Sequence, residues 1–379
     1  MILSNILAKH TAKISILAAG LIVVIGASAL AASLQLVTVI DIPGNKLEQF
    51  DIGYVDSENG RYYVTDRSNA AVDIFDTRKM SYVGRVTGFV GLKYNADKRP
   101  AIVLSGPNGL AFDSVQHQLW AADGDSTVKI IDVKADPPKI IATVNTGGQK
   151  RADELGIDPV DGVVLVGNNA DKPSYVTFIS TKGDHAILGK LEMPDASDGI
   201  DQPLYVRETG MFYASVPIWK EQKTHGGLAV IDPKTFKMVK LIPIDDCGPL
   251  GLAQGPGTKV ILGCGTGSKT RTPEMPNPAT VIIDVATEKV VKVIHELGGQ
   301  DEVWYNPTLH QYYTASRDLP TGPVLGVINA DTDTFIGSIA TGENAHSVAA
   351  DASNNAIFVP LTTPNPACPN GCIGVYQMK

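Results

Sequence analysis

The chain has 379 residues, four cysteines and a formal net charge of −8. An acidic chain without a basic stretch is unsuited to nucleic acid and to anionic membrane surfaces, so we expect neither as a partner. The length exceeds that of a simple single domain, unless the chain is built from repeats that pack on their neighbours.

The first 32 residues are typical of a secretory signal peptide. Lys9 and Lys13 precede an apolar run from Ile14 to Ala27, and Ala29-Leu30-Ala31 fits a small-residue cleavage site. An uncleaved membrane anchor is the alternative. No later segment approaches the roughly 18 continuous apolar residues of a membrane span. We therefore expect residues 33–379 to form a periplasmic or secreted protein that is a monomer and lacks a membrane span.

A unit of four short strands recurs along the rest of the chain. Its third strands end in similar residues, at spacings of 45 to 56: Asp73–Asp76, Lys129–Asp132, Thr177–Ser180, Ala229–Asp232, Val281–Asp284, Gly326–Asn329 and Gly374–Gln377. The second strands form a series in step with it: Tyr62–Asp66, Leu119–Asp123, Leu165–Val166, Phe212–Val216, Val260–Cys264, Tyr312–Ser316 and Ile357–Leu361. A period near 40–50 with four strands per repeat indicates a β-propeller.

The turns between first and second strands support this interpretation. They are rich in Gly, Asn, Asp and Pro, as in Asp56–Gly60 and Asp158–Gly162, and these residues supply the backbone angles of tight hairpins. The seventh unit ends after its third strand, and the segment Gln35–Pro43 resembles a fourth strand. Pairing the two ends would close the ring and remove an exposed edge. We therefore predict an all-β, seven-bladed β-propeller of four-stranded antiparallel blades, the last closed by the N-terminal strand.

The Val-Ile-Asp strands and Asn/Asp-Gly turns resemble those of the YVTN/NHL-type propellers, a broad group that includes the SMP-30/gluconolactonase-like hydrolases. The resemblance covers residues 33–379 and is specific for architecture. It implies a range of activities: metal-dependent lactonases, quinoprotein subunits and binding proteins without a known reaction. In the lactonases it implies a metal held by carboxylate and amide ligands in the central channel.

Loop lengths select one end of the predicted ring. The long connections are 87–106, 217–227, 266–278, 317–323 and 362–371, and all of them emerge at the end where the chain enters the inner strands. A rigid scaffold with long loops on one face is typical of a functional face. Tolerance of insertions at loop tips is the alternative explanation.

The residues that enter the inner strands at this end are unusually polar, and inner strands converge on a narrow channel. Carboxylates that converge there would raise one another's pKa, which a divalent cation relieves. Hard oxygen donors suit Ca²⁺ or Mg²⁺, and a histidine leaves Zn²⁺ open. We assign metal ligation to Asp153, Asp201 and Asp301, ligand binding to Asp51, Asn108, Arg151 and Gln202, and catalysis to Glu154, Glu302 and His346.

In this scheme the metal polarises a carbonyl or activates a water, a spare carboxylate or His346 takes the proton, and Arg151 orients an anionic substrate or an oxyanion. The alternative is structural: acidic residues at strand starts often cap turns or bond neighbouring amides, and Arg151 then neutralises Asp153 or Glu154.

The four cysteines are expected to form disulfides, as is usual for an even number in an exported chain. Cys247 begins an inner strand and Cys264 ends its hairpin partner, which favours their pairing. Cys368 and Cys372 would close a small loop, and a redox or metal pair is the alternative.

Three function classes follow. The first is an exported propeller that binds a small ligand and a divalent metal in its acidic funnel and hydrolyses a lactone or ester. The second is a non-catalytic propeller that presents the same face to an extracytoplasmic protein or polymer. The third is a subunit of a quinoprotein dehydrogenase, which requires a second chain.

Overall fold

The computed structural model describes residues 33–222, 225–265 and 278–378. The predicted signal peptide, residues 1–32, and nearly all of the predicted long loop 266–278 lie outside the described residues. Within the described ranges, no helix has the length and hydropathy that crossing a membrane requires.

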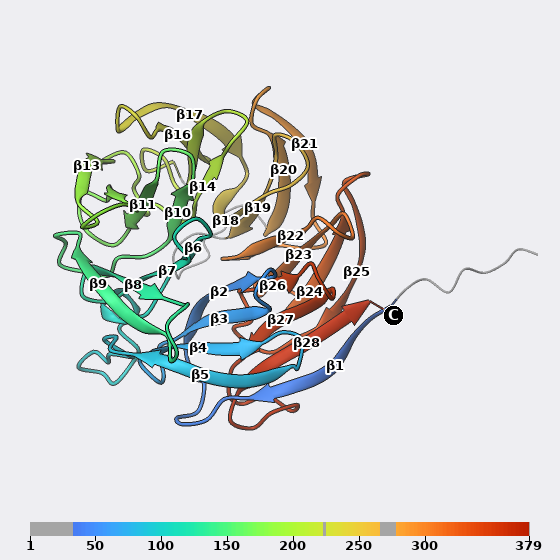
Figure 1. Ribbon diagram of the computed structural model, residues 1–379. Helices are drawn as coiled ribbons and strands as arrows, with labels where there is room; N and C mark the ends of the chain where they lie inside the picture. Colours follow the sequence, from blue (N-terminus) through green and yellow to red (C-terminus); the bar gives the residue numbers. More distant parts are fainter. Residues whose placement is uncertain (1–32, 223–224, 266–277, 379) are drawn as a thin grey trace, which may run out of the picture. The chain divides into compact units, whose positions relative to one another are not determined.

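Seven four-stranded antiparallel sheets stand around a ring, as predicted (Figure 1). The first sheet consists of β2 (Phe50–Asp56), β3 (Arg61–Asp66), β4 (Ala71–Asp76) and β5 (Ser81–Thr87). The second consists of β6 (Leu110–Asp113), β7 (Gln118–Ala122), β8 (Thr127–Asp132) and β9 (Lys139–Asn145). The third consists of β10 (Leu155–Asp158), β11 (Val163–Asn168), β12 (Tyr175–Ser180) and β13 (Ile187–Glu192).

The remaining blades repeat this plan. The fourth contains β14 (Pro203–Val206), β15 (Met211–Val216), β16 (His225–Asp232) and β17 (Lys237–Asp245). The fifth contains β18 (Gly248–Gln254), β19 (Lys259–Gly265), β20 (Ala279–Asp284) and β21 (Lys289–Ile294). The sixth contains β22 (Val303–Asn306), β23 (Gln311–Ser316), β24 (Val324–Asn329) and β25 (Thr334–Ala340). One short 3₁₀ helix, Ile102–Leu104, interrupts the long connection before β6.

The seventh blade joins the two ends of the chain. It contains β26 (Ala349–Asp351), β27 (Ala356–Leu361), β28 (Cys372–Met378) and, as its outer strand, β1 (Leu34–Asp41). β1 runs antiparallel to β28 from Leu34 opposite Met378 to Asp41 opposite Cys372, and Figure 1 shows the first and last strands side by side. The predicted closure by the N-terminal strand is confirmed.

In five of the seven blades the third strand ends in an Asp or Asn that caps the turn that follows. Asp76 is an example: its Oδ1 accepts the backbone N–H groups of Arg78 and Lys79 at 3.0 and 2.8 Å. The same pattern occurs at Asp132, Asp284 and Asn329. Such side chains mimic a backbone turn, so the recurring residue follows from local geometry at the end of the ring opposite the long loops.

The hydrophobic core lies between neighbouring sheets rather than inside one of them. Between the first and second blades, for example, Ile52 and Val72 pack with Leu110 and Leu119. Because each sheet buries both faces against its neighbours, the inner strands are held side by side, and the residues that precede them meet near the axis.

Both predicted disulfides are present. Cys247 is bonded to Cys264 and Cys368 to Cys372. No cysteine is free, so no thiolate is available to hold a metal in this structure.

Candidate functional site

The predicted funnel residues meet where the chain enters the inner strands. Two groups offer ligand atoms within 4.8 Å of one another: Asp51, Asp301 and His346, and Asp51, Asp153 and Glu154. Asp51 lies on β2, whereas the other residues lie one to three positions before β10, β22 and β26. Asp51 belongs to both groups, so four blades contribute to one cluster around it.

Asp51 is held by an arginine that the sequence analysis did not consider. Arg67 forms a buried ion pair with Asp51, and its side chain is 3% exposed. It also donates to the carbonyl of Phe50 at 3.1 Å. Burial alone would raise the pKa of Asp51, but Arg67, together with His346 and Arg151, lowers it to about 2. Asp51 is therefore an anion at neutral pH.

Three of the predicted residues link blades to one another. Asn108 accepts hydrogen bonds from Arg67 at 3.0 and 2.8 Å and donates to the carbonyl of Ala152 at 2.8 Å. Gln202 accepts the backbone N–H of Leu252 at 2.6 Å. Glu302 accepts from the hydroxyl of Ser347 and from the backbone N–H of Gly53 at 3.2 Å. These contacts match the structural alternative.

Arg151 neutralises Asp153, as the structural alternative also anticipated. Its Nη2 lies 2.6 Å from Asp153 Oδ2, and its Nη1 lies 3.9 Å from Asp51. Asn169 donates to the same oxygen of Asp153. Even so, burial raises the pKa of Asp153 to about 7, because Arg151 and Arg67 do not fully offset burial and the neighbouring carboxylates. The other oxygen of Asp153 is buried and has no hydrogen-bond partner.

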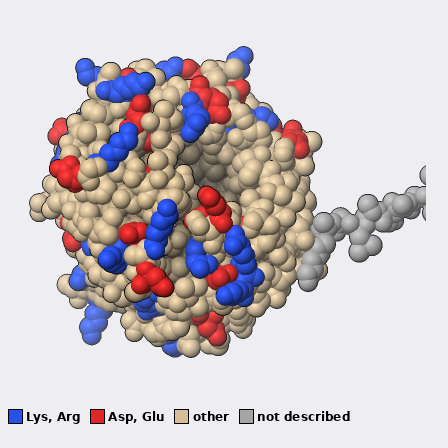
Figure 2. All heavy atoms as spheres, in the orientation of Figure 1, with Lys and Arg blue, Asp and Glu red and all other residues tan. Residues whose placement is uncertain are grey.

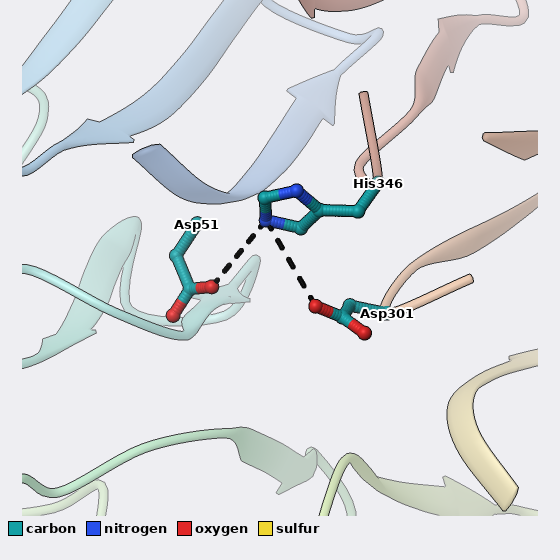
Figure 3. A group of neighbouring side chains, drawn as sticks. All are labelled: Asp51, Asp301 and His346. Carbon is teal, nitrogen blue, oxygen red and sulfur yellow. Dashed lines mark ion pairs between the residues drawn. The ribbon is translucent and has the colours of Figure 1, made fainter. Parts of the chain in front are cut away.

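His346 lies between two carboxylates (Figure 3). Its Nε2 is 3.7 Å from Asp51 and 3.9 Å from Asp301. Its Nδ1 is 2.5 Å from the carbonyl oxygen of Asn344, and since a carbonyl can only accept, Nδ1 carries the hydrogen. The ring stacks on Phe50 with centroids 4.4 Å apart. In neutral His346, a lone pair on Nε2 therefore points toward the acidic cluster.

Asp301 is matched by a second arginine that was not predicted. Arg317 makes two contacts of 2.8 Å with its carboxylate, one from each terminal nitrogen. Such a two-pronged pair fixes the orientation of the carboxylate. Asp301 is thus partly committed to Arg317, and its availability to another ligand is reduced.

Glu154 and Asp201, like Glu302, have no cationic partner among the described contacts. Glu154 is 4% exposed, and its Oε2 is buried without a hydrogen-bond partner. A side chain at Gly109 would place its Cβ 3.0 Å from that oxygen and 2.5 Å from the carbonyl of Asp153, so glycine permits this close approach. Burial, and then the carboxylates of Asp51 and Asp153, raise the pKa of Glu154 well above its usual value.

Asp201 differs from Glu154 because one of its carboxylate oxygens accepts a hydrogen bond. Its Oδ1 accepts the backbone N–H of Gln202 at 2.9 Å. Burial, followed by the charges of Asp301 and Asp153, raises the pKa of Asp201 well above its usual value. Glu302 also has a raised pKa, about 8, mainly through burial.

The cluster has an excess of negative charge. Its carboxylates are Asp51, Asp153, Glu154, Asp201, Asp301 and Glu302, and its guanidinium groups are Arg67, Arg151 and Arg317. With all of these groups ionised, the six negative charges exceed the three positive ones by three. One divalent cation and one proton would balance this excess.

A cavity of about 440 Å³ opens onto this cluster from the long-loop end. The charged residues that line it are four bases and four acids: Lys150, Arg151, Lys172, Arg317, Asp198, Asp201, Asp301 and Asp318. A larger groove of about 540 Å³, lined by Val293 and Phe335 among others, lies beside β21 and away from the buried carboxylates. We therefore identify the candidate site by its chemistry and not by its size.

The arginines that the sequence analysis missed share a position in the repeat. Arg67 directly follows β3, Arg317 directly follows β23, and Asn169 directly follows β11. Each of these strands is the second of its blade. Each of the three residues contacts the carboxylate of an aspartate at or just before the start of an inner strand. The second strands can be aligned from the sequence alone. Examining the residue that follows each of them would have identified Arg67, Arg317 and Asn169.

Fold and site together define a seven-bladed β-propeller with a buried carboxylate–guanidinium cluster at one end of its central channel. No family model matches the sequence, and no curated protein matches it. Many solved structures share the fold. A chain of Kuenenia stuttgartiensis hydrazine synthase aligns with a TM-score of 0.66 and 14% identity, covering 88% of this chain and 98% of that one.

A chain from the crystal structure of a mitotic checkpoint complex aligns with a TM-score of 0.64 and 11% identity, covering 100% of this chain and 98% of that one. At these identities the similarity shows the fold alone, because one propeller architecture supports many unrelated functions. The architecture is consistent with the resemblance to YVTN/NHL-type propellers. These comparisons do not assign the chain to that group.

Proposed function

We propose that the protein binds a small ligand at the channel mouth together with one divalent cation, held by Asp51, Asp153 and Glu154. The observation that carries this proposal is Glu154: a buried carboxylate oxygen without a partner lies beside two other carboxylates, with ligand atoms within 4.8 Å of one another. Buried carboxylates are normally paired or coordinate a metal. Oxygen ligands favour Ca²⁺ or Mg²⁺.

The charge of the cluster supports a single ion. Of the excess of three negative charges, one divalent cation offsets two, and a proton on Glu302, whose pKa burial raises to about 8, offsets the third. A second divalent cation would leave a buried positive excess. Asp51 contributes the oxygen that Arg67 does not hold, since the ion pair with Arg67 uses Oδ2 only. We also propose that the protein works outside the cytoplasm, because its two disulfides persist best in an oxidising compartment.

The test is metal binding by calorimetry after chelator treatment, with Ca²⁺, Mg²⁺, Mn²⁺ and Zn²⁺ in turn. We expect about one ion per chain, and Glu154→Gln should weaken the affinity at least about tenfold, or about 1.4 kcal/mol. Glu58→Gln is the matched control, since Glu58 is exposed in the turn between β2 and β3. If the wild-type protein takes up no divalent ion, or if Glu154→Gln binds it equally well, the proposal is wrong.

Hydrolysis of a lactone or ester at the same site is the second candidate, and His346 favours it. Its Nδ1 is occupied by Asn344, so a neutral His346 has a free acceptor at Nε2, which faces the acidic cluster. A bound divalent cation would polarise a substrate carbonyl or a water. His346 would then accept the proton, a role that typically contributes a factor of about 10² to 10⁴ in rate.

A panel of lactones and esters tests this second candidate. We expect His346→Gln to lower the turnover of any hydrolysed compound at least about a hundredfold, while His117→Gln, in the turn between β6 and β7 at the opposite end, leaves it unchanged. Ligand binding without hydrolysis of any panel member would instead identify a non-catalytic binding propeller.

A further inference from the structure

Two lysines of the third blade line the cavity without a carboxylate partner. Lys150 Nζ donates to the carbonyl of Ala170 at 2.8 Å, and Lys172 Nζ donates to the carbonyl of Ser197 at 2.9 Å. Among the contacts of the described residues, neither ammonium group forms an ion pair. Each carries three donors, so each retains hydrogen-bonding capacity and a full positive charge at the cavity wall.

Arg151 extends this basic wall toward the cluster. One of its terminal nitrogens binds Asp153, whereas its Nε is buried without a hydrogen-bond partner. Lys150 and Arg151 come from the connection between β9 and β10, and Lys172 comes from the connection between β11 and β12. All three therefore belong to one blade. Asp201 and Asp301, from the fourth and sixth blades, line the same cavity.

We propose that the ligand of this cavity is a small anion, carrying a carboxylate or phosphate group that Lys150 and Lys172 contact. The inference rests on the proposed function only in placing the ligand in this cavity. An anion satisfies two ammonium groups that otherwise bond only carbonyl oxygens. A cationic ligand would be repelled by them, and a neutral one would gain no charge interaction with them.

The cation in the proposed function strengthens this assignment. A bound divalent ion offsets negative charge of the buried cluster, which would otherwise repel an anion from a cavity whose own lining has as many acids as bases. A volume of about 440 Å³ lies within the usual range of pockets for small molecules. The expected ligand is thus a small organic acid or phosphate monoester and not a polymer.

The experiment is a calorimetric titration of the Mg²⁺-containing protein with succinate, inorganic phosphate, 1,4-butanediol and putrescine. We expect at least one of the two anions to bind, the diol and the diamine not to bind, and the affinity to fall as salt rises. The double variant Lys150→Ala/Lys172→Ala should weaken anion binding at least tenfold. Lys150→Arg/Lys172→Arg should retain most of it, because the charge is kept.

Lys182→Ala is the matched control. Lys182 also donates to a carbonyl, that of Asp161 at 3.0 Å, but lies in the turn between β12 and β13 at the other end of the ring. Anion binding should be unchanged in this variant. The inference is overturned if neither anion binds, if the double alanine variant binds as tightly as the wild-type protein, or if putrescine binds better than the anions.

The two proposals fail separately. If no divalent ion binds but succinate or phosphate binds and depends on Lys150 and Lys172, the metal site is wrong and the anion site stands. If the ion binds and depends on Glu154 but neither anion binds, the anion site is wrong and the metal site stands. Melting curves of all variants, measured without ligand, confirm that each is folded.

Discussion

At the scale of single residues, the channel mouth combines carboxylates that have an arginine partner with others that have none. Asp51 and Asp301 have arginine partners, whereas Glu154 keeps a buried oxygen without one. Matched pairs hold the blades together, since Arg67 also bonds Asn108 of the second blade. A buried carboxylate without a partner does not help to hold the blades together. For this reason the proposed metal site centres on Glu154.

A second buried pair of acids, Asp66 and Asp73, predicts how stability depends on pH. Asp73 on β4 is fully buried near Asp66. Burial, and then Asp66, raise the pKa of Asp73 to about 8, although Arg85 lies 2.8 Å away and opposes this. The folded protein therefore holds a proton on Asp73 that the unfolded chain, with a value of 3.8, releases.

Because the pKa of Asp73 is higher in the folded protein than in the unfolded chain, the protein should become less stable as the pH rises. The stabilising contribution of protonated Asp73 is fully present below about pH 4 and is lost as the pH rises to about 8. The free energy of unfolding should thus decrease over that range. Asp73→Asn should make the decrease shallower in urea unfolding, and Asp97→Asn, at an exposed position, should not. Parallel pH profiles for wild type and Asp73→Asn would contradict the prediction.

At the scale of elements, β1 is the strand that closes the ring. Ile40 is 5% exposed and packs with Phe50, Phe75 and Phe358 of the first and seventh blades. Leu36, on the same strand, is 39% exposed. The contribution of β1 therefore depends on which side chains face the core, as well as on its ladder with β28.

This difference gives a prediction with an internal control. Ile40→Ala should lower the free energy of unfolding by about 2–5 kcal/mol, the range for truncating a buried aliphatic side chain. Leu36→Ala should change it by no more than about 0.5 kcal/mol. Urea denaturation of both variants measures the effect. Similar values for the two would show that β1 does not dock as the structure describes.

At the scale of the whole molecule, the face that Figure 2 shows is not dominated by one sign of charge. Figure 2 shows acidic and basic side chains interspersed around a central hollow. Neither sign of charge therefore dominates that face, and we expect recognition to depend on groups in particular cavities. The ring is what creates such a cavity, because it brings residues from separate blades to one axis.

Sequence reasoning predicted nearly all of the architecture. The spacing of the third strands, the residues of the turns and the missing fourth strand in the last unit were sufficient for seven blades and their closure, and both disulfides were predicted. These features are local or recur with a fixed period, so they can be read from neighbouring residues. The leader at residues 1–32 remains a prediction.

The candidate site was predicted only in outline. The sequence by itself determined that polar residues would enter the inner strands at one end, because that follows from the repeat. Only the tertiary structure decided that Asp51 pairs with Arg67, that Asp301 pairs with Arg317 and that Glu154 is left without a partner. The physical reason is that an ion pair depends on the direction and depth of two side chains, which the packing of sheets sets and the order of residues does not.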